Sequence, residues 1–225
     1  MQEHPLHDSA LTPDDLTFDF GITGLGGSFH GDWILDAESE QQHIAAMTGF
    51  TEHGIVSQLL LIEDVLRLRD SALTGAEVST LWELTNSNAF DGSPSIKGRE
   101  CVWLDEVLAV VVPVVERFGA PTSSWTSIAP CLPHHDHQAL AGEVKAVPDL
   151  VRPRQNAGVT PHEARAAVNR CADTVCPELA FRFALHALTA FHSSVSPQVF
   201  DRLGDLGSRF GYGEYVVGRI DYLVD

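Results

Sequence analysis

Helix start signals recur along this chain of 225 residues and constrain its fold more than any other feature. The clearest lies at Thr160-Pro161-His162-Glu163, where Thr160 can cap a helix, Pro161 suits the first helical position and Glu163 completes a capping box. Apolar residues at three- and four-residue spacing follow such signals, which is the pattern of an amphipathic helix. The sequence therefore predicts a mainly α protein, a multi-helix globular bundle of about seven to eight helices.

The main predicted helices lie after residue 36. They cover residues 37–48, 52–72, 74–85, 99–118, 136–147, 160–175, 178–191 and 196–209, and a last short helix carries Tyr215 to Leu223. The helix over 99–118 is the most apolar and is expected to form the centre of the core. Pro113 should kink or split this helix. A buried strand over 110–115 is the alternative, because periodicity does not separate helix from strand in a short valine run.

Residues 16–35 show a different pattern, which predicts an N-terminal β-hairpin. Phe18, Phe20 and Ile22 occupy alternate positions, as on one face of a strand. Three glycines shortly after them can take positive φ and form a tight turn, and further aromatic residues follow on the return strand. These glycines lack the order G-x-G-x-x-G, so the turn is not a dinucleotide-binding fingerprint.

Prolines gather between residues 113 and 161 and predict an irregular connection there. A single domain over residues 1–225 is the main prediction, since a chain of this length can bury one sizeable core. The alternative is two lobes, an acidic one over 1–118 and a helical one over 161–225, joined by the proline-rich segment 119–160.

Negative charge is concentrated in the first half of the chain. The net charge is -17, and residues 1–106 hold 19 Asp and Glu against 4 Lys and Arg, which leaves -2 for the remainder. Such a field attracts basic partners and repels nucleic acid. The carboxylates predicted to bind a partner lie close together in sequence around the predicted hairpin: Asp14, Asp15, Asp19, Asp32, Asp36, Glu38 and Glu40.

The charge distribution favours an acidic protein-binding module that docks on a basic protein and needs no cofactor. An immunity or inhibitor protein that neutralises a basic toxin or nuclease is one concrete form of this hypothesis. Acidity for solubility alone is the competing explanation. In that case the chain is a structural or regulatory helical module with no small-molecule site.

A cluster of potential metal ligands supports a second function, a metal-dependent hydrolase of the zinc type. Cys131, His134, His135 and His137 fall within seven residues, and His and Cys favour zinc or another divalent ion. The spacing matches neither paired C-x₂-C motifs nor a helical H-E-x-x-H site, so a solvated loop is the alternative. His30 and Asp32, two residues apart, could supply a base and its orienting carboxylate.

Further sequence features bear on membrane insertion, disulfide formation and the location of the protein. The longest apolar run, residues 107–115, is shorter than the roughly 20 residues that span a bilayer, and the acidic N-terminus does not resemble a secretory signal. The few, irregularly spaced cysteines predict no disulfide framework, and Cys171 and Cys176 are expected to be buried thiols. His186 and His192 are expected to be core or rim histidines of an apolar helix rather than metal ligands. We therefore predict a soluble, cytoplasmic protein with no membrane partner.

The preference for Arg over Lys is typical of GC-rich bacterial genomes, so we predict a bacterial source.

Overall fold

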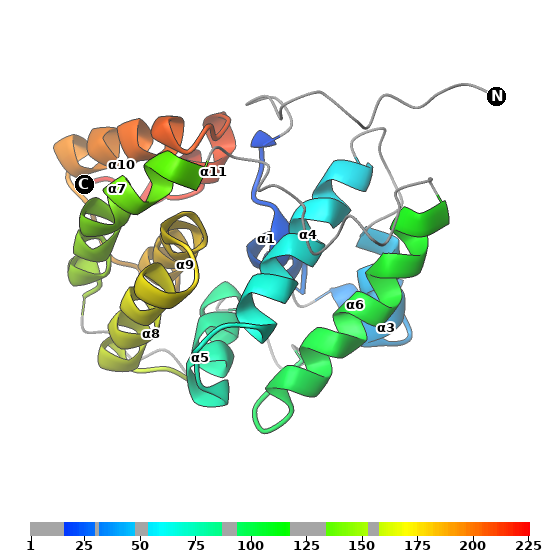
Figure 1. The fold of residues 1–225 in the computed structure, drawn as a ribbon. Coiled ribbons are helices and arrows are strands. Elements are labelled where there is room, and N and C mark those ends of the chain that lie inside the picture. Colours follow the sequence, from blue (N-terminus) through cyan, green and yellow to red (C-terminus); the bar gives the residue numbers. More distant parts are fainter. Residues whose placement is uncertain (1–15, 30–31, 48–53, 87–93, 118–133, 153–157) are drawn as a thin grey trace.

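The computed structural model describes residues 16–29, 32–47, 54–86, 94–117, 134–152 and 158–225. In these residues it forms eleven α-helices and no β-strand, which confirms a mainly α protein and fits a helix bundle (Figure 1). The helices are α1 (Gly21–Ser28), α2 (Trp33–Asp36), α3 (Glu40–Met47), α4 (Gly54–Arg69), α5 (Gly75–Thr85), α6 (Glu100–Arg117), α7 (His134–Ala146), α8 (Pro161–Thr174), α9 (Pro177–Ala190), α10 (Pro197–Arg209) and α11 (Glu214–Gly218). Two short 3₁₀ helices, Pro148–Leu150 and Asp221–Leu223, complete the set.

The predicted N-terminal β-hairpin over residues 16–35 is wrong. Helices α1 and α2 stand in its place, and the glycines assigned to a turn lie inside α1. One of them, Gly26, allows close packing, because a Cβ there would lie 1.8 Å from the hydroxyl oxygen of Thr85 on α5. A Cβ at Gly21, whose φ is 59°, would lie 1.9 Å from a carboxylate oxygen of Asp64 on α4. Tertiary packing therefore overrides the local pattern that predicts strands.

Helices α5, α8 and α10 each begin with a side-chain cap. Thr160 accepts the backbone N–H of Glu163, and Glu163 accepts that of Thr160, so the predicted capping box of α8 is confirmed. Thr74 and Glu77 form the same box at the start of α5. Each box satisfies backbone donors that have no partner within the helix.

Helix α6 continues without a break through Pro113, so the alternative strand over 110–115 is wrong. Pro113 lies on the exposed side of α6, where the carbonyl that loses its hydrogen bond can face water. Cys101, Val102 and Asp105 lie on the same exposed side. Thus α6 is not the central helix that its apolar composition predicts.

The centre of the core is α9, in which every residue from Pro177 to Thr189 is buried. It packs against α5, α7 and α8, and it also contacts α1. Figure 1 shows α8 and α9 on one side of the molecule and α3 and α6 on the other, with α1, α4 and α5 between them. The number of domains stays a prediction. No helix among the described residues is long and apolar enough to cross a membrane.

Candidate functional site

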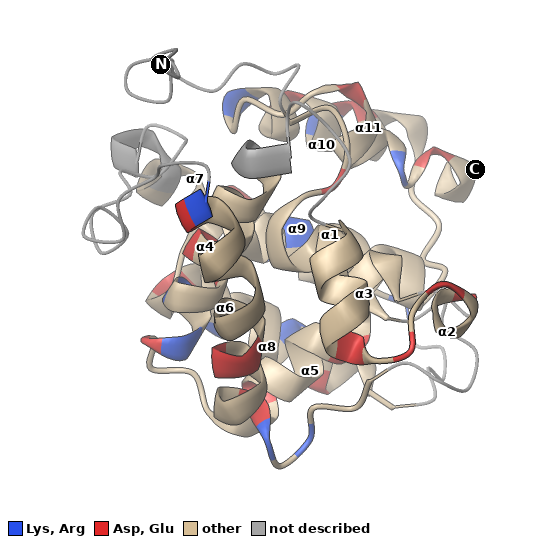
Figure 2. Cartoon of the chain, turned by 90° about the vertical axis from the view of Figure 1, so that its right-hand side faces the viewer, with Lys and Arg blue, Asp and Glu red and all other residues tan. Residues whose placement is uncertain are grey.

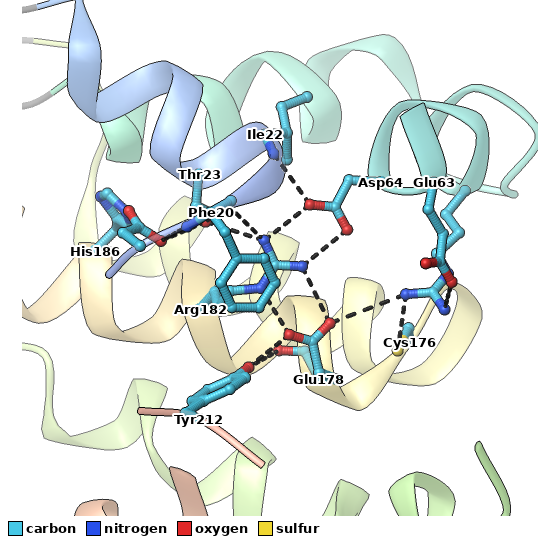
Figure 3. A network of polar contacts seen from close by, with 12 residues as sticks. Phe20, Ile22, Thr23, Glu63, Asp64, Cys176, Glu178, Arg182, His186 and Tyr212 are labelled. Carbon is cyan, nitrogen blue, oxygen red and sulfur yellow. Dashed lines mark hydrogen bonds and ion pairs between the residues drawn. The ribbon is translucent and has the colours of Figure 1, made fainter. Parts of the chain in front are cut away.

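Arg182 lies at the centre of a buried polar network that joins α4 to α9 (Figure 3). Its two terminal nitrogens each donate to one carboxylate oxygen of Asp64 at 2.8 Å. Its Nε donates to Glu178 Oε1 at 2.7 Å, and its Nη2 donates to Glu178 Oε2 at 3.1 Å. Tyr212 donates its hydroxyl proton to Glu178 Oε1 at 2.6 Å. Because Arg182 is only 1% exposed, two carboxylates compensate a charge that water does not reach.

The same network fixes the start of α1. Arg182 Nη1 donates to the backbone oxygen of Phe20 at 3.0 Å and to the hydroxyl of Thr23 at 3.1 Å. Asp64 Oδ2 accepts the backbone N–H of Ile22 at 3.0 Å and so replaces a local N-cap. Four of the eight residues of α1 are glycine, and each costs about 1 kcal/mol relative to Ala in a helix interior. The surrounding structure, rather than its own sequence, therefore stabilises α1.

The ionisation states in this network are fixed. Burial alone would lower the pKa of Arg182, but the carboxylates of Asp64 and Glu178 outweigh it and hold that pKa well above its usual range. Burial alone would raise the pKa of Glu178, but the Arg182 guanidinium outweighs it and keeps that pKa low. Burial and the charge of Glu178 raise the pKa of Tyr212 well above its ordinary value. No proton moves among these three groups near neutral pH, so their arrangement supports a structural role.

A second cluster ties the N-terminal part of the chain to the C-terminal part. Asp19 Oδ2 accepts from His186 Nε2 at 2.7 Å and from Arg219 Nη1 at 2.5 Å. Burial and the nearby Arg219 charge lower the pKa of His186, whose Nε2 also lies 2.5 Å from Arg219 Nη1. Burial alone would raise the pKa of Asp19, but its contacts with His186 and Arg219 outweigh it and hold that pKa well below its usual range.

The depressed pKa of Asp19 predicts a stability term that disappears in acid. This term is fully present above the unfolded-state pKa of about 4 and is lost as the pH falls toward the folded-state pKa. We expect Asp19→Asn to lower the free energy of unfolding by about 2 kcal/mol near pH 7, with the difference shrinking below about pH 4. Urea unfolding followed by circular dichroism, near pH 7 and below about pH 4, measures the difference in free energy of unfolding between the parent chain and Asp19→Asn. Asp32→Asn, at an exposed aspartate, should change stability by less than about 0.5 kcal/mol at either pH. A deficit of Asp19→Asn that is the same at both pH values would contradict the assignment.

The structure places the predicted partner-binding residues in different surroundings. Asp32, Asp36 and Glu38 are exposed on and beside α2, in the region where Figure 2 shows red segments. Glu40, at the start of α3, pairs with Arg99 on the chain segment before α6 at 2.7 Å. Asp19 is partly buried and engaged with His186 and Arg219, as described above. The remaining two, Asp14 and Asp15, lie outside the described residues.

Helix α2 combines an exposed apolar face with a buried anchor. Ile34 and Leu35 are 54% and 80% exposed, whereas Trp33 is buried. The Trp33 ring packs against Phe29 and His43, with ring centroids 5.2 and 5.5 Å apart. Phe29 in turn contacts the core ring of Trp82. The buried Trp33 thus fixes α2 to the body of the protein while its other side faces solvent.

The predicted metal ligands are not tested by the structure. Cys131 lies outside the described residues, and so do the side chains of His134, His135 and His137 in the first turn of α7. Within the described residues, no group of three or more His, Cys, Asp or Glu side chains is placed to hold a metal ion. The zinc site stays a prediction. His30, proposed as a base beside Asp32, also lies outside the described residues.

Ser28 and His43 form a serine–histidine contact, with 2.9 Å between Ser28 Oγ and His43 Nε2. The hydroxyl of Ser28 also donates to the backbone oxygen of Leu25 at 2.6 Å. A serine hydroxyl has a single proton, so His43 Nε2 must donate in this arrangement. A histidine nitrogen that donates cannot accept the serine proton, and the pair is therefore not an activated nucleophile.

Sequence analysis missed the central ion network, although a signal for it exists. Glu178, Arg182 and His186 recur at four-residue spacing on a helix whose other residues are largely apolar. Such a polar stripe marks either a solvated face or a buried set of ion pairs, and periodicity alone does not decide between them. The predicted burial of Cys171 and Cys176 is confirmed, and His186 is buried in α9, whereas His192 is exposed just after the end of α9.

No known protein family matches the chain, and neither does any curated protein or any solved structure. The proposals below therefore rest on the geometry alone. The network around Arg182 is interior and the cluster around Asp19 is partly buried, whereas the surface around α2 is exposed. This surface is the candidate functional site.

Proposed function

We propose that this protein binds a basic protein through the exposed carboxylates Asp32, Asp36 and Glu38, hereafter the acidic tract. The observation that carries the proposal is that these groups are exposed and have no Lys, Arg or His of the described chain within ion-pair distance. Three uncompensated negative charges lie within seven residues of sequence. They favour a partner that brings positive charge to them.

Several surface cations elsewhere in the described chain are engaged with carboxylates, whereas no ion pair of the described chain involves the acidic tract. The pairs are Arg69 with Asp70 and Asp105, Arg99 with Glu40 and Glu106, Lys145 with Asp173, and Arg209 with Glu143. In each pair the positive charge offsets a negative one at short range. The field of the acidic tract is not offset in this way and extends into the solvent.

The expected consequence is electrostatic steering. Clustered charge raises the rate at which an oppositely charged protein associates, and salt screens the effect. An immunity or inhibitor protein that neutralises a basic toxin or nuclease is the concrete form we favour, because such a role requires fast association. Nucleic acids and anionic membranes are not expected as partners, since the acidic tract repels their phosphates.

Affinity capture from cells of the protein's own source tests the proposal. The bait is the full chain, alongside a variant with Asp32→Asn, Asp36→Asn and Glu38→Gln. A matched control carries Asp201→Asn, Asp205→Asn and Asp221→Asn, three exposed aspartates of the C-terminal part. Both variants change the net charge equally, so only the position of the lost charge differs.

We expect the parent chain and the C-terminal control to retain the same basic protein at low salt. The acidic-tract variant should retain less of it by about 10-fold or more. Equal retention by all three baits would contradict the proposal, and so would a captured protein that is acidic.

A further inference from the structure

We infer that Ile34 and Leu35 form the apolar anchor of the docking site, and that they enter an apolar pocket rimmed by Lys and Arg on the basic partner. The inference rests on the proposed function and specifies how the partner is held. The acidic tract surrounds this pair in sequence: Asp32 precedes it, and Asp36 and Glu38 follow it. An apolar centre with a charged rim is the usual anatomy of a protein-binding surface.

The exposure of the pair is unusual for large aliphatic side chains. Leu35 is 80% exposed and Ile34 is 54% exposed, and they are consecutive residues on one short helix. Phe18 and Tyr215 are also exposed, but their rings stack on each other with centroids 5.2 Å apart. Burying two adjacent aliphatic side chains in a partner removes a substantial apolar area from water.

The pair is also held on a rigid base. Trp33, directly before it, is buried against Phe29 and His43, and Ala37, two residues after it, is buried as well. The backbone N–H of Ala37 donates to the Trp33 oxygen at 3.0 Å and closes α2. A side chain presented from a fixed backbone loses little conformational freedom on binding, which is a property of binding hot spots.

Charge identifies the partner of this apolar pair. A second copy of the chain would bring an identical acidic tract and a second net charge of -17, so like charges would face each other. Anionic lipid headgroups would be repelled for the same reason. A pocket rimmed by Lys and Arg both accepts the aliphatic pair and neutralises the carboxylates around it.

Site-specific photo-crosslinking tests the inference. The photoreactive residue p-benzoylphenylalanine replaces Leu35 in the full chain, and in two control chains it replaces Val102 or Tyr222. Both control positions are more than half exposed, at 58% and 56%, and lie on other elements. The three chains are irradiated at low salt in an extract of the source cells, and the crosslinked peptides are identified by mass spectrometry.

We expect position 35 alone to give an adduct, with the crosslink on an apolar residue of a basic protein that has Lys or Arg nearby in sequence. In kinetic measurements on that protein, Leu35→Ser and Ile34→Ser should each raise the dissociation rate by about 10-fold or more. Their association rates should stay within about 3-fold of the parent, because the acidic tract is intact.

The outcomes separate this inference from the proposed function. A basic protein crosslinked equally well from position 102 or 222 would overturn the anchor and leave the proposed function standing. Adducts at position 35 with a second copy of the chain or with lipid would also overturn the anchor. If no basic protein were crosslinked from any position, the proposed function and the anchor would both be contradicted.

Discussion

Replacing Arg182 by Met is expected to lower the free energy of unfolding by about 3–5 kcal/mol. The substitution removes the guanidinium that donates to both Asp64 and Glu178, and it leaves these two carboxylates buried, with Arg67 still 3.9 Å from Glu178. A buried charge without a partner costs more than the lost ion pair contributes, since water cannot solvate it. The start of α1 should also loosen, because Arg182 holds the backbone oxygen of Phe20.

Urea unfolding at neutral pH, followed by circular dichroism, measures the effect. Arg202→Met is the matched control, because Arg202 is exposed on α10 and should change stability by less than about 0.5 kcal/mol. If the Arg182 variant does not fold, hydrogen exchange of Arg182→Lys provides the second measurement. Lys keeps the charge but not the planar fork, and we expect faster exchange in α1. If Arg182→Met and Arg202→Met had the same free energy of unfolding, the central role of Arg182 in the buried network would be contradicted.

Alanine at Gly26 and at Gly27 should change stability in opposite directions, although the two glycines are adjacent on α1. A Cβ at Gly26 would lie 1.8 Å from Thr85 Oγ1 and 2.4 Å from Thr85 Cβ, so α1 or α5 must move. We expect Gly26→Ala to destabilise the protein by about 1–3 kcal/mol. A Cβ at Gly27 would lie 3.9 Å from its nearest neighbour, His186 Cε1, which is an ordinary contact. Gly27→Ala should therefore stabilise the protein by about 0.5–1 kcal/mol through its higher helix propensity.

Thermal and urea unfolding of the two alanine variants give the comparison, with the parent chain as reference. The two substitutions also distinguish helix α1 from the β-hairpin that the local sequence pattern predicts. In a tight turn both glycines would take positive φ, and alanine would then destabilise at either position. Destabilisation by both substitutions would contradict α1, whereas opposite signs follow from the helix.

The parts of the fold that could be predicted are those in which the signal is local. Capping residues such as Thr160 and Glu163 act within one turn, so the start of α8 could be placed from sequence. The apolar periodicity likewise predicts α4, α5 and α9 to within a few residues, and Ser196-Pro197 marks the start of α10. Helix α1 could not be predicted, because its glycines have low helix propensity and its N-cap comes from Asp64.

The same distinction applies to the candidate site. The excess of acidic residues before residue 107 is visible in the sequence, and it directed attention to the segment that contains the acidic tract. Sequence could not separate Asp36, which faces solvent, from Asp19, which pairs with His186 and Arg219 far along the chain. Nor could it show that Leu35 is exposed, since an aliphatic residue beside a tryptophan ordinarily indicates the core.

The central claim is that the position of the acidic tract, and not the total charge of the protein, recruits a basic partner. The association rate constant of the captured partner, measured at about 20 mM and about 500 mM salt, tests this most directly. At low salt the acidic-tract triple variant should associate about 10-fold more slowly than the parent chain, while the C-terminal triple variant matches the parent. At high salt all three rates should converge. Equal slowing of both triple variants at low salt, or no slowing of either, would contradict the claim.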